Sequence, residues 1–416
     1  MRKEPIFPSD WKVRTLDEVS IKIQDGTHFS PTLGGNEYRY ITSRNIGAGR
    51  LRLDSVEMIS KDEHQKIYRR CNVRFGDLLL TKDGASTGNA AINSFHDEIS
   101  LLSSVAFIRS HPQQSTEEYI LQYLLSARGR KQIADAMAGN AITRLTLAKI
   151  KALRVPLPSV AEQRRIASTL RSADDLIVLL ERLVAKKQAI KQGMMQQLLT
   201  GRNRLPGFDS AWTEVELDDL LAFKNGLNKG GKYFGLGTPI VNFMDVMKGS
   251  IITREDVIGR VTLTRDEIKR FSAKRGDLFF TRTSETVEEV GTAATLVDDV
   301  PNATFSGFIL RGRPKATDID SRFVAYLFQL NTIRQQVRAS ATYTTRALTN
   351  GRSLGRVFIR LPEATEQRAI ADVIEDADRE IALLRGRVDK ARNVKQGMMQ
   401  ELLTGHTRLP VRKAAA

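Results

Sequence analysis

The clearest hydrophobic pattern in the chain is a heptad seam that occurs twice. In each copy the apolar residues are separated by alternating steps of four and three, which is typical of the a and d positions of a coiled coil. The seam residues are Ile166, Leu170, Ala173, Ile177, Leu180 and Val184 in the first copy, and Ile370, Ile374, Ala377, Ile381, Leu384 and Val388 in the second. Each copy therefore predicts a helix of about 40 residues, or about 60 Å at about 1.5 Å per residue.

Signals for the start and the end of a helix flank both seams. Ser159 and Glu162 have the spacing of a capping box before the first seam. In the second copy Glu363 stands where the serine was, so we expect the cap to shift to Thr365. Each helix should end near a glycine that follows the letters LLT, at Gly201 and at Gly405.

A repeat organises the whole chain. "KQGMMQQLLTG" at 191–201 returns as "KQGMMQELLTG" at 395–405, and the helical segment contains no insertion or deletion between its copies. The likeness is weaker elsewhere, as between "WKVRTLDEV" (11–19) and "WTEVELDDL" (212–220). Such a period indicates two copies of a variable domain followed by a constant helix. We expect the two helices to bury their seams against each other in antiparallel fashion, with the chain termini close together; an ordinary buried core helix is the alternative.

The segments between the helices predict α+β domains. Alternating stretches with glycines, 37–53 and 238–254, are typical of strands and turns. The stretches "GDLLLTK" and "GDLFFTR" predict buried strands, and helices are expected at 116–126 and 320–330. Short helices should follow the capping boxes Ser60 to Glu63 and Thr264 to Glu267. The fold class is therefore α+β, with two globular domains joined by two long antiparallel helices. The expected parts are domains 1–157 and 202–361, helices 158–201 and 362–405, and a tail 406–416.

Glycine and methionine stand together inside both helical phrases. Glycine in a helix interior costs roughly 1 kcal/mol relative to alanine, and both copies keep it, at Gly193 and Gly397. One interpretation is close approach of a partner backbone beside an adaptable methionine surface. The alternative is that the methionines are core and the glycines allow a mild bend. The methionines are Met194, Met195, Met398 and Met399.

Composition and charge narrow the partners. Lys and Arg outnumber Asp and Glu by 64 to 48, a net charge of +16, which favours a polyanion. The excess is +6 in residues 1–158 and +6 again in 201–362, by counting the sequence. No apolar run is long enough to span a membrane and no secretory signal opens the chain, so we expect a cytoplasmic protein without a membrane partner. The single cysteine, Cys71, allows no internal disulfide.

Hydroxyl and basic side chains recur at matching places in both domains. Loops after the buried strands combine them, as do the segments before the long helices, and such groups suit phosphates and base edges of duplex DNA. For each of these residues a solvated surface role is the alternative. The candidates are Thr81, Lys82, Ser86, Thr87, Thr143 and Arg144 in the first domain, and Lys229, Lys232, Thr281, Arg282, Thr283, Ser284, Tyr343, Thr345 and Arg346 in the second.

Catalytic and metal-binding patterns are absent from the sequence. "GLNKGGK" at 226–232 has the spacing of a phosphate-binding loop, but Tyr233 stands where magnesium binding needs Ser or Thr. Glu267 in "EIK" is better explained as a helix cap than as half of a nuclease site. Five scattered histidines show no metal spacing, and His28 reads as a loop residue. No methyltransferase motif occurs.

The ordered set of motifs resembles one known family, the specificity (S) subunits of type I restriction-modification systems. The resemblance covers the whole chain and depends on "LPxxxEQxxIA" at 158–167 and 362–371 and on the "KQGMMQxLLTG" phrases. The opening "IQDGTHFSPTLGGNEYRYITSRNI" (23–46) is similar to the family's, whereas the second domain departs from it. This resemblance adds Asp25, Thr27, His28 and Arg44 to the DNA-binding candidates.

The resemblance implies a function without catalysis in this chain. Each domain would read one half of an asymmetric bipartite duplex DNA site, and the helices would set the spacer and dock two methyltransferase (modification) subunits. Restriction and translocase subunits would join through that complex. S-adenosylmethionine, ATP and magnesium are then expected on partner subunits only, and no cofactor on this chain. Two alternatives remain open: a coiled-coil scaffold that binds acidic proteins, and a self-contained methylase or nuclease.

Overall fold

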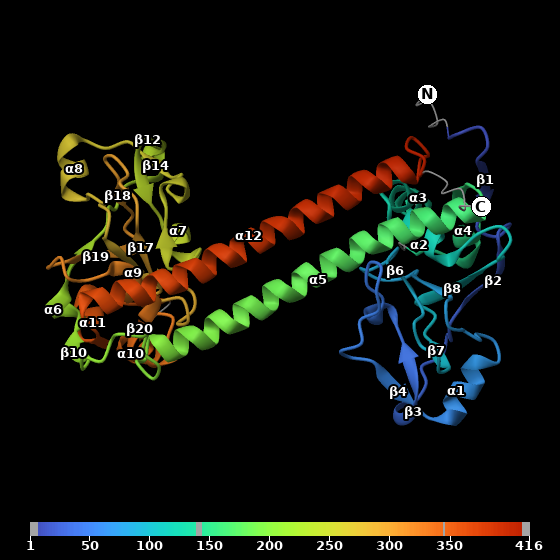
Figure 1. The fold of residues 1–416 in the computed structure, drawn as a ribbon, viewed down its shortest axis with the longest axis horizontal. Helices are drawn as coiled ribbons and strands as arrows, with labels where there is room; N and C mark the ends of the chain where they lie inside the picture. The colour runs from blue at the N-terminus through green and yellow to red at the C-terminus, as the bar shows by residue number, and fades with distance from the viewer. Residues whose placement is uncertain (1–6, 139–143, 344–345, 410–416) are drawn as a thin grey trace. The chain divides into compact units, whose positions relative to one another are not determined.

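The computed structural model describes residues 7–138, 144–343 and 346–409 of the 416-residue chain. It divides into two compact units, unit 1 (residues 1–182 and 385–416) and unit 2 (residues 183–384). The long helices α5 (Val160–Leu198) and α12 (Ala364–Leu402) each contribute a segment to both units (Figure 1). Each helix has 39 residues, in agreement with the length expected from the seams.

Unit 1 contains an antiparallel four-stranded sheet, a three-stranded sheet and a two-stranded ribbon. The strand orders are β2-β8-β5-β6, β4-β3-β7 and β1-β9. In chain order the elements before α5 are β1 (Lys12–Thr15), β2 (Ser20–Asp25), β3 (Leu33–Ile41), the 3-10 helix η1 (Ser43–Asn45), β4 (Glu57–Ile59), α1 (Lys61–Tyr68), β5 (Leu78–Thr81), β6 (Ala90–Ile92), β7 (Ile99–Leu101), β8 (Val105–Ser110), α2 (Glu117–Leu125), α3 (Ala127–Met137), α4 (Leu147–Lys151) and β9 (Arg154–Leu157).

Unit 2 repeats this plan with a larger central sheet. The strand orders are β11-β19-β15-β17-β13, β14-β12-β18, β16-β21-β20 and β10-β22. Its elements between the long helices are β10 (Thr213–Glu216), α6 (Leu217–Leu220), β11 (Leu221–Asn225), η2 (Gly231–Tyr233), β12 (Phe234–Val241), α7 (Phe243–Met247), β13 (Ile251–Ile252), η3 (Arg254–Asp256), β14 (Arg260–Val261), α8 (Arg265–Arg270), β15 (Leu278–Thr281), β16 (Thr283–Ser284), β17 (Ala293–Leu296), β18 (Thr304–Phe305), β19 (Ile309–Pro314), α9 (Ser321–Leu327), α10 (Asn331–Ser340), β20 (Thr342–Tyr343), β21 (Ala347–Leu348), α11 (Gly351–Gly355) and β22 (Phe358–Leu361).

The central strands are buried on both faces, which explains their unbroken apolar sequences. On β5, Leu78 and Leu80 enter the core that also holds the base of α5, whereas Leu79 enters a second core under β3 and β7. β15 does the same in unit 2, where Phe280 and Phe279 enter different cores. The predicted buried strands are therefore confirmed. The predicted strand stretches 37–53 and 238–254 are each interrupted, by η1 and by α7.

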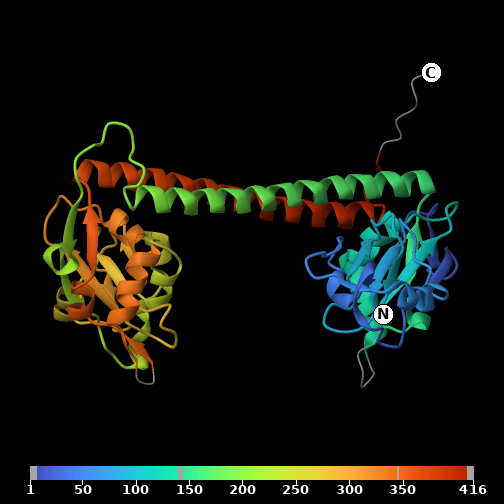
Figure 2. The same ribbon diagram turned by 90° about the horizontal axis from the view of Figure 1, so that it is seen from below.

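The long helices run antiparallel within each unit. In unit 1 the pairs Asp174–Lys395 (2.6 Å) and Glu181–Arg392 (2.7 Å) join residues whose numbers rise on one helix and fall on the other. In unit 2 the pairs Lys187–Glu380 (2.7 Å) and Lys191–Asp378 (2.6 Å) show the same direction. The strands of each unit lie on one side of its helix segments (Figure 2). The antiparallel pairing expected from the seams is confirmed.

The seams are the most buried stripe of both helices. On α12 the residues Ile370, Ile374, Ile381, Leu384 and Val388 are all buried. On α5 Ile166 and Leu170 are buried, and Ile177, Leu180 and Val184 are half-buried. Ile166, Leu170, Ile370 and Ile374 also belong to the cores of the globular parts. Within one seam, some residues therefore belong to the core of a globular part, and the others serve the coiled coil.

The helix ends agree with the sequence signals at three of four points. Ser159 accepts a hydrogen bond from the Glu162 N–H (3.3 Å), as a cap should. Gly201 (φ 68°) and Gly405 (φ 75°) take the left-handed conformation after the last turn. The expected shift of the second cap to Thr365 is wrong, because α12 begins at Ala364 and Thr365 lies inside it.

A clamp of three side chains closes each unit at the start of a long helix. In unit 2 Glu366, which is 1% exposed, accepts two hydrogen bonds from Arg204 (2.5 and 2.6 Å) and one from Trp212 (3.2 Å). In unit 1 Glu162 accepts two from Arg408 (2.5 and 2.7 Å). The clamp explains why the Glu of the EQ motif and the downstream Arg repeat at one offset.

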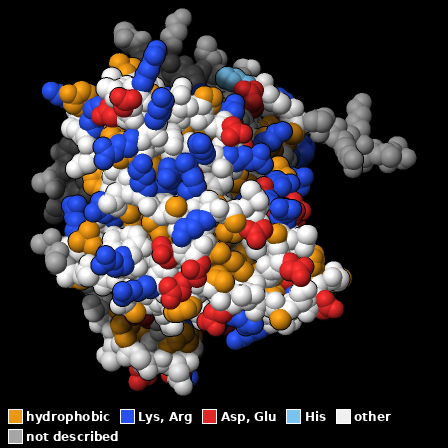
Figure 3. All heavy atoms as spheres, turned by 90° about the vertical axis from the view of Figure 1, so that its left-hand side faces the viewer, with side chains coloured by type: hydrophobic (Ala, Val, Ile, Leu, Met, Phe, Trp, Pro, Cys, Tyr) orange, Lys and Arg blue, Asp and Glu red, His pale blue; other side chains and the backbone are white. Residues whose placement is uncertain are grey.

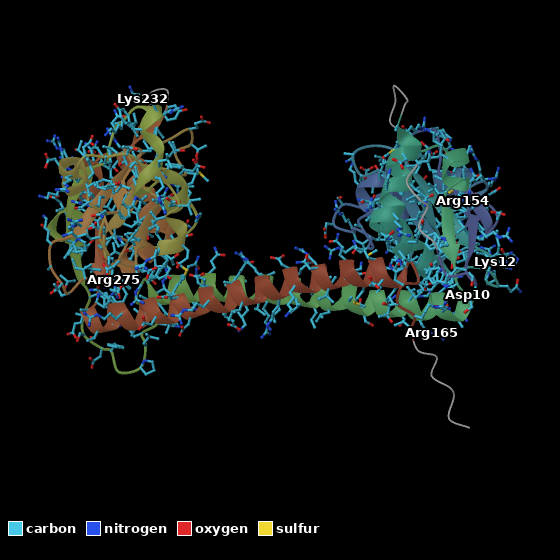
Figure 4. The ribbon with its side chains drawn as sticks, turned by 90° about the horizontal axis from the view of Figure 1, so that it is seen from above. Asp10, Lys12, Arg154, Arg165, Lys232 and Arg275 are labelled. Carbon is cyan, nitrogen blue, oxygen red and sulfur yellow. The ribbon has the colours of Figure 1, made fainter. Side chains whose placement is uncertain are left out.

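The two described ends of the chain meet at the clamp of unit 1. Arg408 also donates to both carboxylate oxygens of Asp10 (3.2 and 3.0 Å), and Figure 4 shows Asp10 beside the long helices. A Cβ at Gly405 would lie 2.5 Å from Pro8. The expectation that the two ends of the chain lie together is confirmed for these residues.

The methionines of the helical phrases pack on the cores of their own units. Met195 is 6% exposed and belongs to a core of unit 2, with Met194 against it. Met398 and Met399 pack against a core of unit 1. An exposed docking role is therefore wrong for Met195, because its side chain is enclosed. A Cβ at Gly193 or Gly397 would meet nothing within 4 Å among the described residues, so none of these residues requires glycine there.

Candidate nucleic-acid interface

Five segments of unit 1 that are distant in sequence meet at the end of β5. The Lys82 N–H donates to the Ser104 carbonyl (2.9 Å), and the Lys82 carbonyl accepts from the Leu145 N–H (3.0 Å). Ser43 N–H donates to the Ser104 hydroxyl oxygen (3.2 Å), and Thr27 exchanges backbone bonds with the segment 101–103. We name the segments 25–29, 42–45, 82–88, 102–104 and 144–146 loop cluster 1.

Unit 2 builds the same framework from a different sequence. The Arg282 N–H donates to the Phe308 carbonyl (3.0 Å), and the Arg282 carbonyl accepts from the Thr349 N–H (2.9 Å). Leu227 accepts a backbone bond from Gly307 (2.7 Å), in the way that Thr27 accepts one from Ser103 (2.8 Å) in unit 1. We name the segments 225–229, 242–245, 282–284, 306–308 and 346–349 loop cluster 2.

Glycine is required at the same point of both frameworks. A Cβ at Gly26 would lie 2.0 Å from the Leu101 carbonyl oxygen, and a Cβ at Gly226 would lie 2.0 Å from that of Ser306. Such distances are impossible for any other residue without moving the backbone. The apparent departure of the second domain from the first around 225–232 therefore concerns side chains, whereas the backbone path is retained.

Four of the candidate DNA contacts lie in the interior, which corrects the expectation for them. Thr81 and Thr281 are fully buried at the ends of their strands, and Asp25 and Lys82 are 3% and 2% exposed. The Lys82 ammonium lies 3.4 Å from a carboxylate oxygen of Asp25 and 3.4 Å from one of Asp83. A buried charge needs such partners, so Lys82 supports the loop from below and does not reach a ligand.

Three further candidates are occupied by neighbours. Ser284 is 7% exposed and donates a hydrogen bond to Glu289. Thr27 is 7% exposed, and its hydroxyl accepts from the Phe29 N–H (3.2 Å). Lys229 is held by both carboxylate oxygens of Glu267 (2.8 and 2.7 Å). Glu267 also completes the capping box of α8 with Thr264, as expected.

The remaining described candidates offer side chains to solvent. Arg144 is 45% exposed and bound to Asp83 (3.0 Å), and Arg346 is 59% exposed. Arg282 is half-buried, and its Nε has no hydrogen-bond partner among the described residues. The others with exposed or half-exposed side chains are His28, Arg44, Ser86, Thr87, Lys232, Thr283 and Tyr343. Thr143 and Thr345 lie outside the described residues.

The figures place basic groups over unit 2. Figure 3 looks onto the side where the strands of unit 2 lie in Figure 1, and shows Lys and Arg side chains across this face with fewer acidic ones between them. Lys232 lies at the end of unit 2 far from the long helices, and Arg275 lies near them (Figure 4). The surface suits a polyanion.

Sequence reasoning missed two exposed apolar side chains in loop cluster 2. Met244 is 66% exposed and Phe308 is 62% exposed. They occupy the framework positions that Arg44 and Ser104 hold in unit 1. Alignment of "ITSRNI" with "VNFMDV" would have revealed that Met244 replaces Arg44. The exposure of Phe308 was harder to predict, because an isolated Phe in a strand-rich segment is normally interpreted as a core residue.

The described residues contain no cluster of three or more His, Cys, Asp or Glu that could hold a metal ion. Cys71 is 1% exposed, and burial raises the pKa of its thiol to about 12, so it is not a nucleophile. Among the described residues no helix combines the length and apolarity needed to cross a membrane.

Comparison with known proteins agrees with this arrangement. The family model described as "Type I restriction modification DNA specificity domain" matches residues 8–192. Over these residues the chain is similar to this family. Similar members of the specificity-subunit family include the putative type I restriction enzyme MjaX specificity subunit of Methanocaldococcus jannaschii, 23% identical over 430 residues and covering 97% of this chain and 95% of the relative. The EcoKI specificity subunit of Escherichia coli K12 is 23% identical over 396 residues, covering 89% and 82%.

Solved specificity subunits share the fold. The S subunit from M. genitalium has a TM-score of 0.59 at 15% identity and covers 97% of this chain and 98% of its own. The HsdS subunit from Thermoanaerobacter tengcongensis has a TM-score of 0.51 at 18% identity, covering 98% and 100%. The two-domain, two-helix organisation predicted from the sequence is thus that of specificity subunits.

Proposed function

We propose that this chain is the DNA sequence-recognition subunit of a type I restriction-modification complex. Residues 1–157 and 202–361 are the two target-recognition domains, and each reads one half of an asymmetric bipartite duplex site. The helices 158–201 and 362–405 set the spacer between the half-sites and dock two methyltransferase subunits. The chain itself carries out no methylation or cleavage, which belong to the partner subunits.

One observation supports this proposal more than any other. The two loop clusters share a backbone framework, including Gly26 and Gly226, yet differ in the side chains that the framework presents. Two domains that read different base sequences need this combination. Contacts to the phosphates position a protein on DNA, whereas the side chains that reach the bases determine which sequence it binds.

The charge of the chain agrees with a duplex as ligand. Its net charge is +16, and each domain carries +6 by counting the sequence. An acidic protein partner would be attracted by the same charge but would show no preference for a base sequence. Binding should therefore weaken steeply with salt and should strengthen for one bipartite motif.

The direct test is methylation mapping in cells. Long-read sequencing of methylated bases in the host, with this gene present and deleted, should reveal one bipartite motif that depends on the gene. The Arg44→Ala and Arg282→Ala variants should each relax recognition of a different half-site, by about tenfold in affinity if each arginine holds a guanine. Loss of no motif on deletion would overturn the proposal.

The role of the helices can be tested separately. A seven-residue heptad inserted after Val184 and another after Leu384 would keep the seam in register and lengthen both helices by about 10 Å. The spacer of the methylated motif should then grow by about three base pairs, at about 3.4 Å per base pair. An unchanged spacer would remove the ruler role without affecting sequence reading by the domains.

A further inference from the structure

We propose that loop cluster 2 recognises thymine through contacts of Phe308 and Met244 with its 5-methyl group. This inference rests on the proposed function, because it names the base chemistry that one of the two domains reads. Loop cluster 1 holds Ser104 and Arg44 at the same positions, and its exposed Phe29 (46%) lies on a different segment, 25–29. The two half-sites should therefore differ in their dependence on thymine methyl groups.

The exposure of Phe308 is not required by the fold. The backbone carbonyl of Phe308 accepts a bond from the Arg282 N–H (3.0 Å), and serine performs this task in unit 1, where Ser104 accepts from Lys82 (2.9 Å). The neighbouring Ile309 is fully buried, whereas Phe308 is 62% exposed. An exposed phenyl ring forfeits the free energy that its burial would give, which a ligand can restore.

Met244 shows the same contrast with its neighbours. Phe243 packs against the core, and Asp245 is 5% exposed and accepts the Asn242 N–H (2.8 Å). Asn45 does the same for Thr42 (2.9 Å) in unit 1. Met244 alone points outward, with 66% of its surface exposed, at the position of the exposed Arg44.

The shared backbone framework brings Phe308 and Met244 to the same edge of loop cluster 2. In unit 1 the Leu102 N–H donates to Ile41 (3.0 Å) and the segment that follows reaches Ser43. In unit 2 the Ser306 N–H donates to Val241 (3.0 Å), so 306–308 passes the start of α7 in the same way. Because Ser104 bonds to Ser43, the neighbour of Arg44, the shared framework places Phe308 beside Arg282 and toward the turn that carries Met244.

The major groove of DNA contains one apolar group that the exposed apolar side chains of loop cluster 2 can recognise. Every base pair presents donors or acceptors there, but only thymine adds a methyl group, which phenyl and other apolar side chains contact. Arg282 beside Phe308 supplies a donor for a phosphate or a neighbouring guanine. Insertion of Phe308 between bases in the minor groove is the competing DNA-binding mode, and the two modes respond differently to removal of the methyl group.

The experiment uses the chain assembled with its methyltransferase subunits and duplexes that carry the mapped motif. Each specified thymine is replaced in turn by uracil, which removes only the methyl group. We expect about 5- to 10-fold weaker binding for at least one position in a single half-site, near the lower limit for a methyl group in an apolar pocket. Phe308→Ser should weaken binding to thymine DNA similarly and abolish the difference between thymine and uracil at that position.

Phe358→Ser is the matched control. Phe358 is 46% exposed on β22, outside loop cluster 2, and its backbone bonds to Gln336 do not involve the ring. This variant should retain the full uracil effect. The inference is overturned if uracil changes binding less than twofold at every position, if neither half-site specifies an A·T pair, or if Phe308→Ser weakens thymine and uracil duplexes equally. Absence of any bipartite preference would instead refute the proposed function.

Discussion

Removing the glutamine of either EQ motif should destabilise one unit selectively. Gln367, which is 3% exposed, accepts the Asp320 N–H (2.9 Å) and donates to the Pro362 carbonyl (2.9 Å). Gln163, which is fully buried, accepts the Thr116 N–H (3.1 Å) and donates to two carbonyls (2.9 and 3.0 Å). Each amide thus ties the start of a long helix to the N-cap residue of a domain helix, Thr116 of α2 or Asp320 of α9.

Leucine has a similar volume but satisfies none of these groups. Gln367→Leu leaves two backbone groups without partners and Gln163→Leu leaves three, one of them on the exposed Gln114, at about 1–3 kcal/mol for each buried group. Burial of the leucine side chain returns about 1–2 kcal/mol. The free energy of unfolding should therefore fall by about 2–3 kcal/mol in each unit.

The two tryptophans allow each unit to be followed alone. The chain has two, Trp11 in unit 1 and Trp212 in unit 2. In a Trp11→Phe background the fluorescence reports unit 2, and in a Trp212→Phe background it reports unit 1. With a urea dependence of roughly 2–3 kcal/mol per molar, Gln367→Leu should lower the midpoint of unit 2 by about 1 M.

The matched controls are exposed glutamines on the same helices. Gln196→Leu for unit 2 and Gln400→Leu for unit 1 change the same chemical group at positions open to solvent, and should shift the midpoint little. The reasoning is refuted if Gln367→Leu and Gln196→Leu shift the unit 2 midpoint equally. A shift of both tryptophan signals by Gln367→Leu would show that the two units unfold together.

Three further predictions follow from individual contacts. Ile381→Ala, at a seam position 5% exposed, should lower the free energy of unfolding by about 2–4 kcal/mol in urea titrations. Gly193→Ala and Gly397→Ala should each raise it by up to about 1 kcal/mol, because the new Cβ meets no atom in the part of the chain that the structure describes; weaker methyltransferase binding by these stabler variants, measured by calorimetry, would place a partner at the glycines. Gly226→Ala should reduce affinity for the bipartite duplex in filter binding, since its Cβ would overlap the Ser306 carbonyl.

The helices could be predicted closely because their signals are local and repeated. The seam, the cap at Ser159 and the terminal glycines lie within one element, and the second copy supplies an independent reading of the same pattern. Antiparallel pairing followed from the need to bury two equal seams. The failed cap at Thr365 shows the limit, since a side-chain cap is a preference of about 1 kcal/mol that the fixed offset of the repeat can override.

The candidate site was less predictable because exposure depends on distant residues. Lys82 lies on what the sequence reads as a polar loop, but Asp25, 57 positions earlier, holds its ammonium in the interior. Thr81 and Thr281 are the last residues of buried strands. Their hydroxyl groups indicated surface positions in the sequence, but both side chains are buried. Phe308 is the opposite case, an aromatic residue that the tertiary framework turns outward.

The repeat separates two tasks of the chain. One is to hold the long helices to the domains, and the other is to present the side chains that would read DNA. Residues that hold the helices to the domains, such as Glu366, Gln367 and Arg204, recur at one offset because any change in their spacing would break contacts of 2.5 to 2.9 Å. The loop frameworks tolerate a drifting offset, since backbone bonds to residue 104 or 308 do not depend on the side chain. Side chains on the loop frameworks can therefore change, and with them the proposed base specificity, while the contacts that hold the helices to the domains stay constant. This division explains why the two copies keep one offset throughout the helices, with ten of eleven letters identical between 191–201 and 395–405, and differ where they would meet DNA.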